Sequence, residues 1–430
     1  MVADKISESE CTLLREKVFS IQIGTTLFRL SGASIASDAP SYFSRFFEDQ
    51  LSQDPDGNNI RTLYIDRDPV TFQEIVRHLQ GYHCNPKDGS EFVKLFADAQ
   101  FYGLPRLMSQ LFESPIMIQI GDRHFNITRD IFSGPGDSPN FFSLGFGAFF
   151  ASPVEVFPGL DRRNLLRPPA IQPPIVPNRS GDVFAQIAHL LRGYPLNIES
   201  EAQRAELLRD CRYFHLRGLE QKLIPHDISF NPIRGRSEII IRLEDVRRSG
   251  INVGHDGVTV TYSRPFVDDS SHDLVLEIGN EDTTIDPRTM RPQFQNSARA
   301  RVVSLLQIIV DRKNSNSQNP TKSTGTKHTT RVHVDKETDL IINGEQQLNY
   351  HLPDSATTEP QAKRRRVEAS GSEQQSENSG PWVVRNGQWQ ILIRSREDPE
   401  DSVEFVLVAV KLDVYTRQRV RNQRQAFLGS

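Results

Sequence analysis

The sequence predicts an α+β protein in which two similar modules precede a β-rich region. Three observations carry this prediction: an internal repeat in the first half of the chain, helical spacing of apolar residues within each copy, and short β-branched runs beyond about residue 227. The chain has 430 residues, a length that corresponds to about two to four domains.

The internal repeat is visible as matching strings in the two halves of the N-terminal region. The string Ile-Gln-Ile-Gly occurs at 21–24 and again at 118–121, and a Phe follows four positions after each Gly. A constant offset of 112 positions then relates a longer series of residues. The pairs include Arg67 and Arg179, Phe72 and Phe184, Ile75 and Ile187, Leu79 and Leu191, Asp98 and Asp210, Leu104 and Leu216, and Leu107 and Leu219. A repeat of this length indicates two copies of one domain, each with its own core.

Local signals place the elements of the first copy. Apolar residues alternate from Val18 to the turn at Gly24, which predicts the first strand of a β-hairpin. Asp68-Pro69 is a helix start, because Asp caps the first turn and Pro lacks only an N–H that this turn does not need. The expected elements are a hairpin at 18–30, a helix within 34–47, a strand at 63–66, and helices at 69–80, 92–102 and 104–111.

The first copy also contains strings typical of a known domain family. They are Leu63-Tyr-Ile-Asp-Arg-Asp-Pro-Val-Thr-Phe72, Leu79-Gln-Gly-Tyr82 and Ala97-Asp-Ala-Gln-Phe-Tyr-Gly-Leu104. With the order hairpin, helix, strand and three helices, these strings resemble a BTB/POZ domain of the potassium-channel-tetramerisation subtype. The second copy departs from this pattern, because 178–182 replaces the acidic string and an insertion rich in Phe and Pro lies at about 145–177. The whole chain resembles fungal tandem BTB proteins with an additional C-terminal region.

Beyond residue 227 the composition favours β-structure. Strands are expected at 238–243, 258–262, 274–278, 331–334, 340–342 and 403–412, and the run 302–310 is either a strand or a helix. A low-complexity stretch at about 352–380 is predicted to be a disordered loop. Asn386-Gly387 is predicted to be a hairpin turn. The strands after the loop are expected to pair with the earlier ones, because a lone hairpin is marginal in water.

The resulting plan has four parts. They are a flexible N-terminus at 1–14, a first BTB/POZ-like domain at 15–114, a second at 115–226 with its insertion at about 145–177, and a β-rich domain at 227–430 interrupted by the basic loop at about 352–380.

Composition and charge limit the classes of partner. The formal net charge is -4, which provides no strong field toward nucleic acid or a membrane surface. The longest apolar run, at 405–411, is too short to span a bilayer, and the N-terminus lacks a signal-peptide core. Three widely separated cysteines, Cys11, Cys84 and Cys211, indicate reduced thiols in the cytosol or nucleus.

No catalytic, cofactor or metal site is expected from the sequence. Gly145-Phe-Gly147 lacks the third glycine of a dinucleotide loop, and the phosphate-loop, His-Glu-x-x-His and Gly-x-Ser-x-Gly patterns are absent. Some domains of the resembled subtype hold an interface zinc ion with His and Cys, but no further Cys pair follows His83-Cys84. We therefore predict a non-enzymatic protein; an enzyme housed in the β-rich region is the alternative from another class.

The resemblance implies a scaffold protein that uses its BTB/POZ domains to bind a second copy of itself or other BTB proteins. Asp66, Arg67 and Asp68 are the predicted interface residues, because the resembled family uses this polar string between subunits and the planar guanidinium of Arg67 can bridge carboxylates. The resemblance also allows an alternative function as a substrate adaptor of a cullin-type ubiquitin ligase, with the substrate held by the β-rich domain.

One basic run lies inside the predicted loop. Lys363, Arg364, Arg365 and Arg366 are consecutive cations, and such a run in an exposed segment suits the acidic groove of a nuclear import receptor. We therefore predict nuclear residence, with the cytoplasm as the alternative if the run is only a solvated linker. Direct binding of nucleic acid by this run is not expected, because no aromatic residues are interleaved with the cations.

Overall fold

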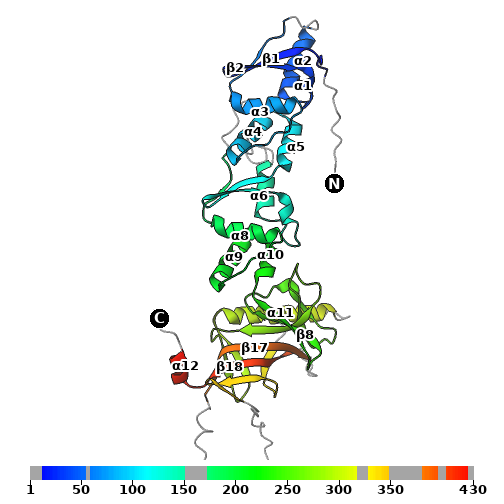
Figure 1. Ribbon diagram of the computed structural model, residues 1–430. Coiled ribbons are helices and arrows are strands. Elements are labelled where there is room, and N and C mark those ends of the chain that lie inside the picture. Colours follow the sequence, from blue (N-terminus) through cyan, green and yellow to red (C-terminus); the bar gives the residue numbers. More distant parts are fainter. Residues whose placement is uncertain are drawn as a thin grey trace, which may run out of the picture. The chain divides into compact units, whose positions relative to one another are not determined.

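The computed structural model describes residues 12–54, 59–150, 172–316, 328–347, 380–395 and 403–424. The chain divides into two compact units, Met1–Glu220 and Gln221–Ser430 (Figure 1). The basic run Lys363–Arg366, the predicted N-terminal flexible segment up to residue 11 and most of the predicted loop at 352–380 lie outside the described residues. Among the residues described, no helix combines the length and the apolar character needed to cross a bilayer.

The first half of the N-terminal unit is a three-stranded sheet packed on five helices. Its elements are β1 (Val18–Ile23), β2 (Thr26–Ser31), α1 (Gly32–Ala36), α2 (Tyr42–Gln53), β3 (Leu63–Ile65), α3 (Pro69–Leu79), α4 (Gly89–Tyr102) and α5 (Pro105–Glu113). β1 pairs antiparallel with β2 and parallel with β3, so the strand order is β2-β1-β3. Phe19, Phe43, Phe72 and Tyr102 are fully buried in its core. The sequence-based predictions of the hairpin, the strand and the helices are confirmed.

Local chemistry fixes where these helices begin and end. The Asp68 side chain accepts hydrogen bonds from the N–H groups of Val70 and Thr71, and Pro69 is the first residue of α3. At the end of α4, Gly103 has a φ of 64°, the left-handed conformation that glycine adopts at low cost.

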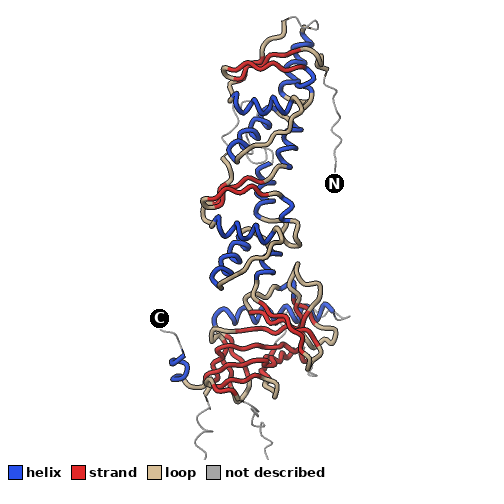
Figure 2. The backbone as a smooth tube through the Cα atoms, in the orientation of Figure 1, coloured by secondary structure: helices blue, strands red, loops and turns tan. Residues whose placement is uncertain are grey.

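The second half of the N-terminal unit repeats this order. Its elements are β4 (Ile116–Ile120), β5 (Arg123–Ile127), η1 (Arg129–Phe132), α6 (Phe141–Phe150), β6 (Ile175–Val176), α8 (Gly181–Leu191), α9 (Glu201–Tyr213) and α10 (Arg217–Leu223). β4 pairs antiparallel with β5 and parallel with β6, giving the strand order β5-β4-β6. Figure 2 shows the same succession of a small sheet and a group of helices twice along this unit. Of the expected insertion at 145–177, residues 151–171 lie outside the described part of the chain.

The C-terminal unit is built on one twelve-stranded sheet with a long helix, α11 (Asn296–Asn316). Its main path runs β16-β15-β18-β17-β11-β10-β9. The strands are β7 (His226–Asn231), β8 (Arg236–Arg242), β9 (Ile251–Val253), β10 (Val260–Tyr262), β11 (His272–Ile278), β12 (Thr283–Asp286), β13 (Arg291–Phe294), β14 (His328–His333), β15 (Asp339–Ile342), β16 (Glu345–Gln346), β17 (Trp382–Ser395) and β18 (Val403–Tyr415). The short helices η3 (Arg248–Gly250) and α12 (Gln418–Arg424) complete the unit.

Two ambiguous or mistaken expectations are resolved in this unit. The run 302–310 lies within α11 and is therefore helical. The prediction of a hairpin turn at Asn386-Gly387 is wrong, because both residues lie inside β17, which pairs with β18 along its length. Register shifts flank this point, and a Cβ atom at Gly387 would lie 2.6 Å from the Trp389 ring. Gly387 thus allows the close approach of an indole rather than a reversal of the chain.

The expected return of the late strands to the earlier sheet is confirmed. β17 pairs antiparallel with β11 and β12, and β18 pairs parallel with β14 and β15. The strands on both sides of the segment 348–379 therefore belong to one sheet.

Candidate protein-interaction surface

The predicted interface residues lie at the junction between β3 and α3. Asp66 directly follows the last residue of β3 and is exposed, Arg67 is half-buried, and Asp68 is the N-cap of α3. Partial burial would raise the pKa of Asp68, but hydrogen bonds from Thr71 and Val70 outweigh it and hold this pKa below its usual value. The main task of Asp68 in this geometry is therefore to cap the helix.

Arg67 has a partner within its own domain. Its guanidinium forms an ion pair with Asp98 in α4, whose side chain is 1% exposed, and it lies 5.6 Å from the ring centre of Phe101. A buried carboxylate without a cation is costly, so this pair contributes to holding α4 beside the β3–α3 junction. The expectation that Arg67 bridges carboxylates of a neighbouring subunit stays a prediction, and a change at this residue would also disturb the domain itself.

The second half of the unit contains an equivalent ion pair. Arg179 lies 3.3 Å from the Asp210 carboxylate in α9 and stacks over Tyr213, with 4.1 Å between its guanidinium carbon and the ring centre. The side chain of Ser180 takes the capping place of Asp68 by accepting from the N–H of Val183. Residues 178–182 therefore differ in sequence from the first copy but keep the arginine and a side-chain helix cap, with Ser in place of Asp as the capping residue.

The outer face of the first sheet exposes apolar side chains. In the strand register, Leu27 of β2 lies beside Gln22 of β1, and Gln22 lies beside Tyr64 of β3. Leu27 is 50% exposed and Tyr64 is 60% exposed, while Val18 on the same face of β1 is 58% exposed. We call Leu27, Gln22 and Tyr64 the outer row. Sequence reasoning missed it, although the alternation of Tyr64 with the buried Leu63 and Ile65 was a signal for it.

The second sheet has a matching row, in which Gln119 lies between His124 and Ile175. The two glutamines make the same local bond, from Gln22 Nε2 to the Gly24 carbonyl at 3.3 Å and from Gln119 Nε2 to the Gly121 carbonyl at 3.1 Å.

The surroundings of the second row differ from those of the first. A cavity of about 330 Å³ separates the second row from the start of α4, with Lys87, Asp88, Gly89 and Ser90 on its other side. Met117 of β4 packs against the core of the first half. The second sheet therefore faces another part of the same unit.

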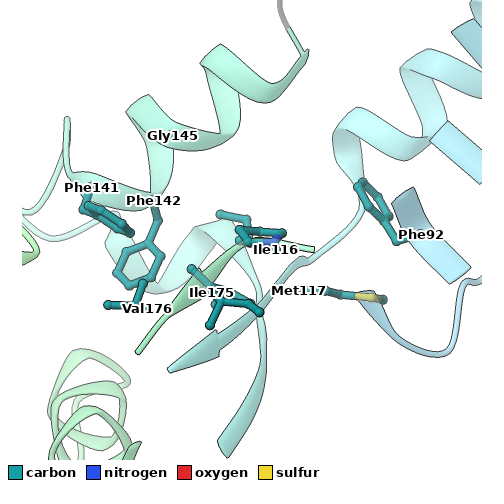
Figure 3. A pocket seen from close by; sticks show the side chains of 10 residues that line it. Phe92, Ile116, Met117, Phe141, Phe142, Gly145, Ile175 and Val176 are labelled. Atoms are coloured by element: carbon teal, nitrogen blue, oxygen red, sulfur yellow. The ribbon is translucent and has the colours of Figure 1, made fainter. Parts of the chain in front are cut away.

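An adjoining apolar cavity of about 140 Å³ marks the same junction (Figure 3). Phe92 of α4 and Met117 lie on one side of it, Phe141 and Phe142 lie on the other, and Ile175 lies between them. Its lining offers apolar contact and no group suited to acid–base or nucleophilic chemistry.

The cysteines of the described residues are structural. Cys84 is 2% exposed and its thiol donates to the Glu74 carbonyl oxygen at 3.2 Å, and Cys211 is also buried. Within the described ranges, no group of three or more His, Cys, Asp or Glu side chains is arranged to hold a metal ion.

Comparison with known proteins identifies the first half of the unit. Residues 19–112 match the family described as BTB/POZ domain. The chain is 37% identical over 249 residues to "Uncharacterized protein YDR132C" of Saccharomyces cerevisiae, covering 56% of this chain and 49% of that protein. It is 34% identical over 242 residues to "BTB/POZ domain-containing protein YLR108C" of the same yeast, covering 56% of this chain and 47% of that protein. The chain thus spans about half the length of the curated relatives that it matches. Residues 19–112 are therefore a BTB/POZ domain of the potassium-channel-tetramerisation type.

Proposed function

We propose that this protein is a non-enzymatic interaction protein that self-associates through the outer row of its BTB/POZ domain. BTB/POZ domains are protein-interaction modules, and such modules are in general not enzymes. The observation that carries the choice of surface is the exposure of Leu27 and Tyr64 on one sheet face. Aromatic and large apolar side chains supply most of the binding energy in protein interfaces, particularly where they cluster.

The comparison of the two sheets supports the same choice. The second row, His124, Gln119 and Ile175, faces the start of α4 in the same unit, whereas the described residues of this unit place no such neighbour on Tyr64. Among the described residues nothing covers the outer row of the first sheet, so this face can receive a second copy.

We further propose that residues 115–226 are a second BTB/POZ-like module that packs on the first and is not the self-association surface. Three matches support a duplication. The strand orders agree, the Arg67–Asp98 pair recurs at Arg179–Asp210, and reciprocal side-chain caps start α2 and α6. The caps are Ser41 with Ser44 in α2 and Asn140 with Ser143 in α6.

Light scattering of the full chain tests the self-association. The parent protein should be an oligomer at micromolar concentration, and Tyr64→Glu combined with Leu27→Glu should shift it toward the monomer, because two carboxylates would be desolvated in the interface. Ile233→Glu is the matched control, since Ile233 is a 75% exposed apolar residue in the C-terminal unit. A parent protein that is strictly monomeric, or a double variant of unchanged size, would refute the proposal.

Affinity purification from cells with mass spectrometry separates scaffold from adaptor. A scaffold should recover tagged copies of the same chain and other BTB proteins. Reproducible recovery of a cullin-type scaffold would instead establish the function as a ubiquitin-ligase adaptor.

We also propose nuclear residence directed by Lys363–Arg366, on the strength of the four consecutive cations. Replacing all four with Ala should move a fluorescent fusion of the full chain to the cytoplasm without changing oligomer size. A parent fusion that is cytoplasmic would show that the run is only a solvated linker.

A further inference from the structure

A groove runs along α11 on the C-terminal unit. One wall is the segment that follows β8, with Leu243, Val246, Arg248 and Ile251, and the other wall is α11 itself. The cavity between them measures about 270 Å³, and a second cavity of about 270 Å³ continues from it past Leu243 and Arg301. Together the two lie within the size range of ordinary ligand clefts, roughly 300–1,000 Å³. We call the first cavity the α11 groove.

The groove has an apolar floor. The helix contributes Arg301, Ser304, Leu305 and Ile308, which lie on one face of α11 because their spacing follows the helical repeat. The floor residues Leu243, Ile251 and Leu305 are buried, and Val246 and Ile308 are half-buried above them. An apolar side chain entering the groove would therefore meet carbon on both walls.

Two arginines stand at the rim of this floor. Arg248 Nη2 donates to the Ser304 hydroxyl at 2.9 Å, and Arg301 Nη1 donates to the Glu244 carbonyl oxygen at 3.0 Å. Both side chains are in exposed residues, and neither has a carboxylate partner among the residues that the structure describes. Each guanidinium has five N–H donors, so most of its hydrogen-bonding capacity remains available.

Three other arginines of this unit show what an acidic partner looks like here. Arg236 lies 3.3 Å from Asp256, Arg385 lies 3.4 Å from Asp413, and Arg421 lies 2.6 Å from Glu281. At the rim of the groove, by contrast, the Arg248 guanidinium has a hydroxyl partner, Ser304, and no acidic partner among the described residues.

The second cavity carries more acidic than basic side chains. Three acids line it, Glu244, Glu277 and Asp282, together with two arginines, Arg242 and Arg301. Glu277 accepts from Gln388 Nε2 at 3.2 Å, and Asp282 accepts from Asn296 Nδ2 at 2.7 Å. An acidic ligand would be repelled at this end, so its carboxylates must lie at the end that holds Arg248.

We propose that the α11 groove binds a short acidic peptide segment of a partner protein. An apolar side chain of the peptide lies between Val246 and Ile308, and a neighbouring carboxylate accepts hydrogen bonds from Arg248. A phosphate or a nucleic-acid backbone would satisfy the arginines but would leave the apolar floor unused. The site does not depend on self-association through the BTB/POZ domain.

A peptide array provides the probe. The full chain is applied to synthetic peptides of about ten residues in which two Glu and one Leu or Phe occupy every relative position. Two matched sets replace Glu with Lys, or the apolar residue with Ser. We expect retention of a subset of the acidic–apolar peptides, and fluorescence anisotropy with the best of them should show weakening as salt is raised.

Variants then locate the site. Arg248→Glu should weaken the anisotropy signal by at least about ten-fold, because a hydrogen bond to a charged group contributes about 1.5–3 kcal/mol and about 1.4 kcal/mol corresponds to a ten-fold change. Ala300→Trp should abolish binding by filling the groove while keeping both arginines and the Arg248–Ser304 hydrogen bond. Arg299→Glu is the matched control, since Arg299 is an exposed arginine of α11 that lines neither cavity.

Several results would overturn the proposal. They are retention of no acidic–apolar peptide, equal retention of the Lys set, unchanged binding by Arg248→Glu, or equal weakening by Arg299→Glu. A change in oligomer size on Arg248→Glu would assign the groove to a second copy of the chain and would also refute the peptide. Tryptophan fluorescence checks that each variant keeps its fold, because both tryptophans lie in β17 of this unit.

Discussion

Asp38 is a buried carboxylate that caps a helix distant from it in sequence. Its side chain is fully buried, Oδ1 accepts from the Arg106 N–H at 2.7 Å, and Oδ2 accepts from the Leu107 N–H at 3.0 Å and lies 2.8 Å from His78 Nε2. Those two N–H groups belong to the first turn of α5, whose own N-cap residue, Leu104, makes no side-chain bond. The carboxylate therefore joins the loop after α1 to the start of α5.

Asp38→Ala should lower the free energy of unfolding of the N-terminal unit by about 3 kcal/mol. The estimate follows from two buried N–H donors left without an acceptor, each of which costs about 1–3 kcal/mol, with part of the loss recovered by relaxation. Asp38→Asn should lower the free energy of unfolding by about half as much. The Asn Oδ1 still accepts one backbone hydrogen bond, but its side-chain NH2 group faces the other backbone N–H, which is also a donor. Asp49→Ala removes an exposed carboxylate from α2 and is the control.

The assay is urea denaturation of the full chain, monitored both by tryptophan fluorescence and by far-ultraviolet circular dichroism. Trp382 and Trp389 are the two tryptophans of the chain, so tryptophan fluorescence reports only on the C-terminal unit. Far-ultraviolet circular dichroism also reports on the helices of the N-terminal unit. Asp38→Ala should move the circular-dichroism transition and leave the fluorescence transition in place. A change below about 0.5 kcal/mol, the usual effect of a surface substitution, or an equal shift of both signals would refute the capping argument.

Three further outcomes are expected. Arg67→Glu should destabilise the BTB/POZ domain by about 3 kcal/mol in circular dichroism, because it leaves the buried Asp98 carboxylate beside a second carboxylate. Partial desolvation acts to raise the pKa of Asp256, but hydrogen bonds from the following turn outweigh it and lower this pKa to about 2. Because the folded pKa lies below the unfolded value, the stability contributed by Asp256 is present above about pH 4 and is lost as the pH falls toward 2. The fluorescence midpoints of the parent protein and Asp256→Ala should therefore differ at neutral pH and converge in acid. Burial, followed by the charge of Glu74, raises the pKa of Cys84 to about 11, and burial also raises the pKa of Cys211, so mass spectrometry should detect alkylation of either thiol near neutral pH only after denaturation.

Local sequence signals were sufficient to predict the helices and strands of the BTB/POZ domain, because residues at the ends of these elements mark where they begin and end. The alternation before Gly24, the Asp68-Pro69 cap and the left-handed Gly103 act over a few residues, and the structure places elements where these signals predict them. The Arg67–Asp98 pair could not be found in this way, because nothing near Arg67 in the sequence identifies its partner 31 positions later. The outer row was likewise a property of three strands in register rather than of one string.

The β-rich unit shows the opposite case, in which pairing overrides a local preference. Asn386-Gly387 has the composition of a tight turn, yet β11, β12 and β18 pair with β17 on its two edges and hold it extended. The backbone requirement for glycine is real, but its cause is the Trp389 indole and not a turn. The α11 groove could not be predicted from the sequence either, because it forms between a helix and a segment that lies far from it in the chain.

The position of β17 and β18 has a consequence for how the protein is made. These strands of 14 and 13 residues lie at the centre of the sheet, although they are synthesised after every other strand of it. Within the described strands, β14 pairs with β18 alone, and β11 has an open edge until β17 arrives. During translation the earlier strands therefore keep unpaired edges until β17 and β18 have been synthesised, and unpaired strand edges are prone to aggregation. A chaperone that shields β11 and β14 until β17 and β18 leave the ribosome would protect the unit, and a premature stop before Trp382 would remove both central strands of the sheet.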